Sequence, residues 1–212
     1  NTEEEIPDYQ VKLFRTAEGY IKKISLTALR TSGEQKLKED DCIIEEVETS
    51  NAGEVIFFGG CSAYKMKIND IPDGKASQLG EFIPNLVGME EKEDIIGMVL
   101  PGDYGAALLF CFENGKCAKV PLASYATKSN RRCLKGAYSD KSPTVGMFCL
   151  TEDTDIMLIS SAEKVLCVNT EKIPLKTTRS TQGVAVMTLR RNAVVSRVCL
   201  AEDSGFAEPK KY

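Results

Sequence analysis

Eight cysteines and no histidine decide much of the chemistry that this sequence could perform. The cysteines are Cys42, Cys61, Cys111, Cys117, Cys133, Cys149, Cys167 and Cys199. None forms a Cys-x-x-Cys pair, and the lack of histidine excludes Ser-His-Asp catalysis, Cys-His catalysis and His-ligated zinc. Most lie in apolar runs, where a free thiol behaves as a small buried hydrophobe. We therefore predict reduced, unmetallated thiols, with a disulfide or metal role as the alternative.

Acidic residues are the other candidates for chemistry, because two facing carboxylates can act as general acid and base. They occur in runs such as Glu39-Asp-Asp41 and Glu90-Glu91, which are typical of a solvated surface. Asp70-Ile-Pro-Asp73-Gly74 looks like part of a calcium loop but lacks the remaining ligands, so we predict a turn. No Walker-type loop and no Gly-x-Gly-x-x-Gly motif occurs. We predict no catalytic residue, no metal and no cofactor, and keep a carboxylate-based hydrolase as an alternative.

Basic residues are sorted along the chain, although the net charge is −4. Residues 11–38 hold seven bases and two acids, whereas residues 39–54 hold seven acids and no base. Residues 107–141 likewise hold seven bases and two acids, and only 55–89 are balanced. A basic surface of this kind would suit a phosphate backbone, while plain solvation of exposed strands is the alternative. The candidate DNA-binding residues are Lys22, Lys23, Arg30, Lys36, Lys116, Lys119, Lys128, Arg131, Arg132, Lys135, Lys172, Lys176 and Arg179.

An internal repeat predicts the elements that position these bases. Four segments share an apolar strand, a turn, a second strand and an apolar anchor, which is typical of a β-hairpin. We centre the four turns on Gly19, Ala63, Gly115 and Lys164. A second marker recurs at Gly33, Gly80, Gly136 and Gly183. A short β-branched strand then closes each unit, at 41–44, 94–96, 144–147 and 193–195.

Several short strands in a period of about 45 to 50 residues are typical of one four-stranded blade of a radial β architecture. No stretch shows the sustained 3.6-residue periodicity of a long helix. The sequence therefore predicts an all-β array of about four four-stranded blades, of the β-pinwheel or β-propeller type. We divide the chain into an acidic linker (1–10), one β domain (11–205) with repeats at 11–54, 55–106, 107–155 and 156–205, and a tail (206–212).

Two segments carry a resemblance to a known family. The first is Phe14-Arg-Thr-Ala-Glu-Gly-Tyr-Ile-Lys-Lys-Ile24, and the second is Arg179-Ser-Thr-Gln-Gly-Val-Ala-Val-Met-Thr-Leu189. They resemble the Thr-x-x-Gly-Tyr-x-Lys strand pair and the Arg-x-x-Gln-Gly-Val stretch in the C-terminal β-pinwheel of the A subunits of DNA gyrase and topoisomerase IV. Glu5-Ile-Pro-Asp-Tyr9 is similar to the linker that enters the first blade of that family.

The resemblance implies a domain that binds duplex DNA, bends it and presents it to a strand-passing core carried elsewhere in the enzyme. It implies as partners duplex DNA, the rest of the A subunit and, through it, the ATPase B subunit. None of the seven tyrosines follows an arginine, as the family's cleaving tyrosine does, so we expect no enzyme activity from this chain alone. The gyrase box Gln-Arg-Arg-Gly-Gly-Lys-Gly is reduced here to Arg30-Thr-Ser-Gly-Glu-Gln-Lys36, which favours a topoisomerase IV-like or reduced role. A protein-interaction propeller without DNA affinity is the alternative.

The apolar runs are short, and the longest, at 106–112, spans seven residues. A membrane-spanning helix needs roughly twenty. The start, Asn-Thr-Glu-Glu-Glu, has the opposite charge to a signal peptide. We accordingly expect a cytoplasmic protein without a membrane partner.

Overall fold

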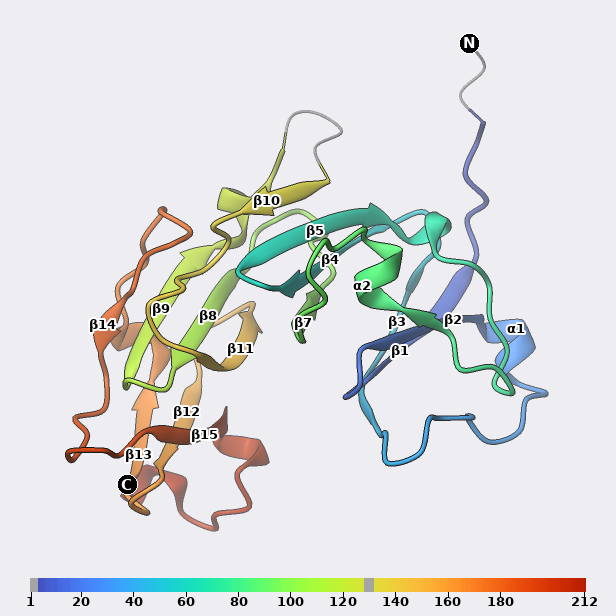
Figure 1. The fold of residues 1–212 in the computed structure, drawn as a ribbon. Helices are drawn as coiled ribbons and strands as arrows, with labels where there is room; N and C mark the ends of the chain where they lie inside the picture. The colour runs from blue at the N-terminus through green and yellow to red at the C-terminus, as the bar shows by residue number, and fades with distance from the viewer. Residues whose placement is uncertain (1–3, 128–131) are drawn as a thin grey trace. The chain divides into compact units, whose positions relative to one another are not determined.

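A computed structural model describes residues 4–127 and 132–212, and it is built almost entirely from antiparallel strands (Figure 1). The strands are β1 (Gln10–Thr16), β2 (Tyr20–Ser25), β3 (Ile43–Ser50), β4 (Glu54–Gly59), β5 (Ser62–Lys67), β6 (Glu81–Phe82), β7 (Ile95–Val99), β8 (Ala107–Phe112), β9 (Lys116–Pro121), β10 (Cys133–Lys135), β11 (Thr144–Leu150), β12 (Asp155–Ser160), β13 (Val165–Asn169), β14 (Val184–Ala185) and β15 (Val195–Leu200). The helices are α1 (Leu26–Leu29), α2 (Ile83–Leu86) and the 3-10 turns Ile68–Asp70, Leu122–Tyr125, Thr170–Lys172, Ala201–Asp203 and Pro209–Lys211.

These strands form four sheets, one for each predicted repeat. Their strand orders are β3-β1-β2-β6, β10-β5-β4-β7, β11-β8-β9-β14 and β13-β12-β15. The centre of each sheet is a hairpin, as in β1 and β2, where Leu13 pairs with Lys23 across the turn at Gly19. The all-β fold class and the four-blade array are thereby confirmed, with three strands rather than four in the last sheet.

Each of the first three sheets is completed by a short strand from the following repeat. The donated strands are β6, β10 and β14, and each follows or precedes one of the predicted marker glycines. Gly80 and Gly183 adopt positive φ angles of 90° and 72°, and both lie against a backbone carbonyl group of the receiving strand. A Cβ atom at either position would clash with that carbonyl, so glycine is required there.

Two of the predicted turn centres are displaced from the true ones. The turns at Gly19 and Gly115 have φ angles of 93° and 85°, as tight hairpin turns require. In the second repeat, the left-handed residues are Gly60 and Cys61 rather than Ala63, and in the fourth it is Glu163 rather than Lys164. Cys61 and Glu163 are not glycines, and residues other than glycine rarely adopt positive φ, so a search for turn glycines does not find these two positions.

The described chain divides into two compact units, each with its own core. Unit 1 holds the chain up to Gly60 together with Tyr64–Gly102, and unit 2 holds Cys61–Ala63 together with Asp103–Tyr212. The core of unit 1 is formed by Val11, Leu13, Ile21, Val55, Phe57, Ile68, Ile71, Ile83 and Met98. The core of unit 2 is formed by Leu109, Cys111, Cys117, Leu150, Ile156, Leu158, Ile173, Met187 and Val195. Within the described residues, no helix is both long and apolar enough to cross a membrane.

The cysteines differ widely in accessibility, which leads to a prediction about their reactivity. Cys111 and Cys117 face each other across β8 and β9, and both are buried with their sulfur atoms 3.2 Å apart. The hydrogen bond with Cys117 and burial together raise the pKa of the Cys111 thiol. Because both thiols are buried and the reagent cannot reach them, we expect both to resist alkylation in the folded protein, whereas the exposed Cys42 and Cys149 react first. Mass spectrometry after timed labelling with iodoacetamide measures this order, and early labelling of Cys111 would contradict it.

Candidate nucleic-acid interface

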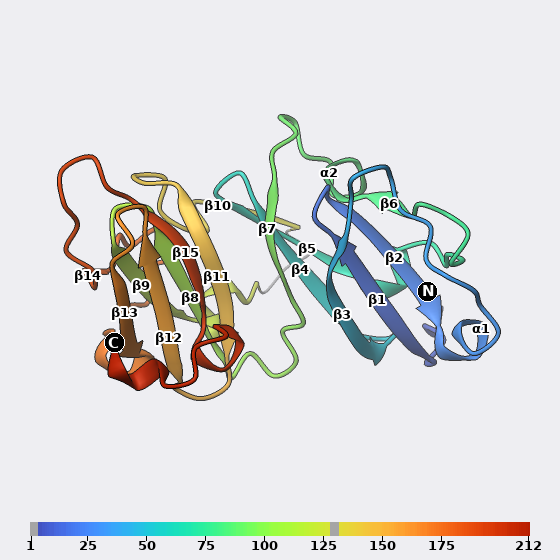
Figure 2. The same ribbon diagram turned by 90° about the horizontal axis from the view of Figure 1, so that it is seen from below.

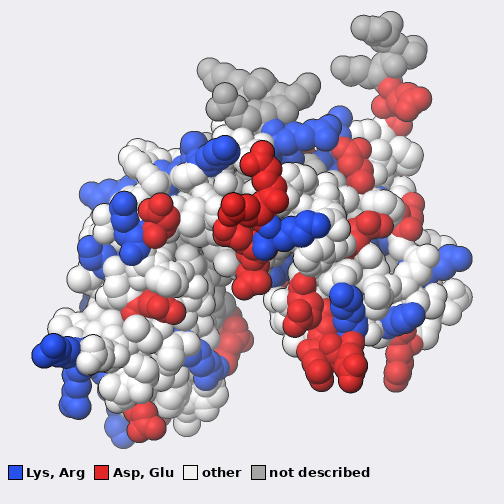
Figure 3. Space-filling model, in the orientation of Figure 1, with Lys and Arg blue, Asp and Glu red and all other residues white. Residues whose placement is uncertain are grey.

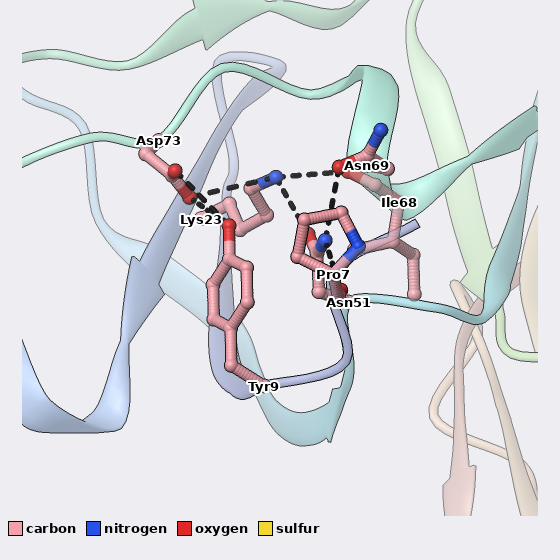
Figure 4. A network of polar contacts seen from close by, with 7 residues as sticks. All are labelled: Pro7, Tyr9, Lys23, Asn51, Ile68, Asn69 and Asp73. Carbon is pink, nitrogen blue, oxygen red and sulfur yellow. Dashed lines mark hydrogen bonds and ion pairs between the residues drawn. The ribbon is translucent and has the colours of Figure 1, made fainter. Parts of the chain in front are cut away.

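Lys23 is a candidate residue whose ammonium group points into the protein rather than toward solvent (Figure 4). Its Nζ atom donates to Asn51 Oδ1 at 2.8 Å and to the Ile68 carbonyl at 3.2 Å. It also lies 3.5 Å from Asp73 Oδ1, which accepts a hydrogen bond of 2.8 Å from the Tyr9 hydroxyl. The side chain is 1% exposed, so it ties β2 to the 3-10 turn of the next repeat.

Lys119 occupies the same position in the third repeat, four residues after the turn glycine. Its Nζ atom donates to the Thr170 carbonyl at 2.8 Å and to Asp153 Oδ1 at 3.3 Å. The Thr170 hydroxyl also donates to Asp153, and these hydrogen bonds with Thr170 and Lys119 lower the pKa of the Asp153 carboxyl group. In both repeats, a lysine on the second hairpin strand therefore donates to the carbonyl group of the first residue of a 3-10 turn in the next repeat.

Lys22 is the third candidate that points inward. Its Nζ atom donates to Gln35 Oε1 and to the carbonyl groups of Lys36 and Ala76, at 2.8, 2.9 and 3.2 Å. Burial without a carboxylate partner lowers its pKa. Lys22, Lys23 and Lys119 are 1%, 1% and 8% exposed, so the structure gives them a role inside the fold. Because their ammonium groups bind other parts of the fold, we do not propose these three lysines as phosphate ligands.

The other candidates in unit 1 lie on its surface. Arg30 and Lys36 are exposed, and so is Lys75, which the sequence analysis did not select. Arg30 and Lys75 line one depression of about 660 Å³, together with Tyr9 and Asp73. The opposite charge dominates β3, where Glu46 and Glu48 are exposed. The exposed acids of β3 would repel phosphate from this part of unit 1.

Unit 2 carries a long basic segment that contains no acid. Between Lys172 and Arg191 the sequence holds five bases and no acid: Lys172, Lys176, Arg179, Arg190 and Arg191. Arg179 is half-buried and the other four are exposed. Basic atoms accordingly gather over β14 and the loop that follows it, along the left margin of Figure 3.

Backbone contacts hold this basic segment against β9. The Lys176 amide donates to the Lys119 carbonyl at 2.9 Å, and the amides of Val186 and Met187 donate to the Gly115 carbonyl. Arg179 Nη1 donates to the Ser124 carbonyl at 3.0 Å. These contacts fix the segment at several points, while the side chains of Lys172, Lys176, Arg190 and Arg191 are exposed to solvent.

The remaining candidates of unit 2 lie on two different sheets, at β9 of the third and at β10 of the second. Lys116 is half-buried at the start of β9 and lies 3.5 Å from Gln182 Oε1 of the basic segment. Arg132 and Lys135 are exposed at β10. Lys128 and Arg131 lie outside the described residues, so the densest predicted cluster is described only in part.

Sequence reasoning missed Arg190 and Arg191, although both are exposed at the end of the basic segment. The signal that could have found them is the complete lack of acids from 172 to 191. Among residues 4–127 and 132–212, no group of three or more cysteine, aspartate or glutamate side chains is placed to hold a metal ion. What the arrangement offers is a fixed row of positive charge.

Comparisons with known proteins agree with this fold. No protein-family model matches the sequence. The A subunit of DNA topoisomerase 4 from Staphylococcus aureus is 25% identical over 175 residues, which cover 79% of this chain and 22% of that subunit. The chain therefore spans about a fifth of the length of this curated relative.

Solved structures show the same likeness. The C-terminal domain of DNA topoisomerase IV matches 92% of this chain and 62% of that structure, with a TM-score of 0.81 and 19% identity. The C-terminal domain of DNA gyrase A matches 92% of this chain and 67% of that structure, with a TM-score of 0.62 and 20% identity. The C-terminal domain of ParC from E. coli matches 90% and 78%, with a TM-score of 0.68 and 12% identity. The resemblance predicted from the sequence is confirmed.

Proposed function

We propose that this homologue of the topoisomerase IV A subunit, with the fold of its C-terminal domain, binds and bends duplex DNA. The observation that carries the proposal is the acid-free basic segment 172–191, held by backbone hydrogen bonds along β9. Arg132 and Lys135 are further exposed bases of the same unit. Four bases, Lys116, Lys172, Lys176 and Arg179, are the remaining predicted contacts in this unit.

Such an interface would read the DNA backbone rather than the bases. Each phosphate that a lysine or arginine neutralises releases condensed counterions, so affinity depends steeply on salt. Contacts to the backbone position DNA without reading sequence, and bending adds only a weak preference for deformable sites. Acidic β3 in unit 1 cannot lie against phosphate, so the DNA path must avoid it.

Within a larger enzyme, the bound DNA would be presented to a strand-passing core. The chain covers 22% of the topoisomerase 4 A subunit, so we propose that the rest of an A subunit, and through it the ATPase B subunit, are its partners. No tyrosine follows an arginine here, so we propose that this chain contributes DNA binding and no cleavage. The absence of the full gyrase box between Arg30 and Lys36 favours a topoisomerase IV-like role.

Neutralising three exposed bases of the basic segment tests this interface. We expect the triple variant Lys176→Gln, Arg190→Gln and Arg191→Gln to bind a fluorescent duplex more weakly on any sequence. The slope of log affinity against log salt should fall by about three units at most, since each lost phosphate contact removes about 0.9. Fluorescence anisotropy between about 50 and 200 mM salt measures both quantities.

A second triple variant changes the net charge equally without touching the proposed interface. Lys12, Lys141 and Lys210 each lie within 4.0 Å of a carboxylate, at Glu46, Asp140 and Asp155. Changing these three lysines to glutamine should leave the salt slope unchanged. An equal loss of affinity in both triple variants would show that only net charge matters. If the unmodified chain does not bind DNA at about 50 mM salt, a protein-interaction role becomes the better account. The net charge of −4 also favours that role.

A further inference from the structure

Leu175 is an exposed apolar side chain within the basic segment 172–191. It is 54% exposed, the highest value among the large hydrophobic side chains that face solvent in the described residues. Its neighbours Pro174 and Lys176 are exposed as well, and so is Lys172. The segment contains no acid. An apolar side chain therefore lies between exposed positive charges.

The backbone on both sides of Leu175 is held in place. Ile173 is 2% exposed in the core of unit 2, and its amide donates to the Thr170 carbonyl at 3.1 Å. The Lys176 amide donates to the Lys119 carbonyl at 2.9 Å, and a parallel bridge pairs Leu175 with Lys119. Because this backbone is already ordered, little conformational entropy is lost when a ligand covers the leucine.

The second repeat shows what occupies the same position elsewhere in the chain. Asp73 is equivalent to Leu175, because both follow an Ile-Pro pair and each forms a parallel bridge to a buried lysine, Lys23 or Lys119. The Asp73 side chain is 63% exposed, although two repeats follow it in the sequence (Figures 2 and 4). Exposure is therefore a property of this position in the repeat.

The lysine network does not require a polar residue in place of Leu175. Asp73 lies 3.5 Å from the Lys23 ammonium group and so takes part in that network. Near the Lys119 ammonium group, the carboxylate comes from Asp153 instead, at 3.3 Å. A single exposed leucine is common on protein surfaces. The informative features here are the fixed backbone and the exposed bases on either side.

On the basis of the DNA binding proposed above, we propose that Leu175 inserts as a wedge between two base pairs of the bound duplex and thereby bends it. An apolar side chain inserted from the minor groove partly unstacks one base step and kinks the duplex. Lys172 and Lys176, on either side of the leucine, bind phosphates beside that step. Asp73 cannot act in this way in unit 1, because phosphate repels its carboxylate.

Two labelled duplexes of about 30 base pairs, one fully paired and one with a central mismatch, test the wedge. A mismatch lowers the cost of unstacking, so the unmodified chain should bind the mismatched duplex about tenfold more tightly. Leu175→Ala should reduce this preference to about twofold, with an unchanged salt slope because no charge is altered. Fluorescence anisotropy measures the affinities. Energy transfer between dyes at the two duplex ends should show a smaller bend with Leu175→Ala.

Two further variants separate insertion from a general effect of the substitution, and circular dichroism checks that each is folded. Leu175→Met keeps an apolar wedge and should retain both the mismatch preference and the bend. Ile44→Ala removes a side chain that is 50% exposed on acidic β3 and should change neither. If Leu175→Ala keeps the preference and the bend, the wedge is wrong while the proposed DNA binding stands. If the unmodified chain binds neither duplex at about 50 mM salt, both proposals are wrong.

Discussion

Replacing Lys23 with alanine is expected to destabilise the protein by about 3 kcal/mol, as is usual when one partner of a buried polar network is removed. The ammonium group of Lys23 is bonded to Asn51 and to the Ile68 carbonyl, both deep in unit 1. Without it, the oxygen atoms of these residues lose their donor, and the 3-10 turn that begins at Ile68 loses its link to β2. Asp73 contributes less, since its side chain is 63% exposed.

Urea unfolding followed by circular dichroism measures this loss. The control is Lys12→Ala on the neighbouring strand, because Lys12 pairs with Glu46 at 3.2 Å across partly exposed β1 and β3. That change should cost at most about 1 kcal/mol. Lys119→Ala should behave like Lys23→Ala, since it makes the equivalent contact in unit 2. Equal unfolding midpoints for Lys23→Ala and Lys12→Ala would show that the buried network does not stabilise the fold.

The repeat and the fold class were predictable because they depend on local residue patterns. Gly19 and Gly115 are glycines at positive φ between apolar strands, which is a direct hairpin signal. The marker glycines Gly80 and Gly183 were also found from spacing alone. Their role was not, because the close approach to the preceding repeat is a tertiary contact.

The exact turn positions of the second and fourth repeats could not be predicted from the sequence. Cys61 and Glu163 occupy the left-handed turn positions, and neither residue type favours that conformation. When the four repeats are aligned on their observed turn residues, Lys65 and Cys167 occupy the position that Lys23 and Lys119 hold in the first and third repeats. In the fourth repeat, Cys167 therefore stands where the first and third repeats have a buried lysine.

The sequence also could not predict whether the lysine side chains point into the protein or toward solvent. Lys22 and Lys23 are adjacent on β2, so they point to opposite faces, and an exposed strand would leave at least one of them free. Both are buried because backbone carbonyls of other segments receive them on each side. Counting bases along the sequence could not separate the bases that serve the fold from those that face solvent.

Replacing Gly183 with alanine is expected to lower the free energy of unfolding by about 3 to 5 kcal/mol, because the added methyl group causes both backbone strain and overpacking. This is the largest loss of stability that we expect from adding one methyl group. Its φ angle is 72°, and a Cβ atom there would overlap the Cys117 carbonyl and lie 2.7 Å from the Ala118 Cα atom. The backbone of β9 cannot yield, so β14 must leave the sheet.

Gly136→Ala provides the matched control, because Gly136 has a similar φ angle of 62° but open space around it. The Gly136→Ala variant should lose only about 1 to 2 kcal/mol of unfolding free energy, which is the usual strain of alanine in this conformation. Urea unfolding measures both variants. Gly183→Ala should also bind DNA more weakly under folding conditions although every basic residue is retained, because the 172–191 segment is no longer held along β9. If Gly183→Ala matches Gly136→Ala in stability, then the basic segment is not seated against β9, and the proposed DNA interface loses its support.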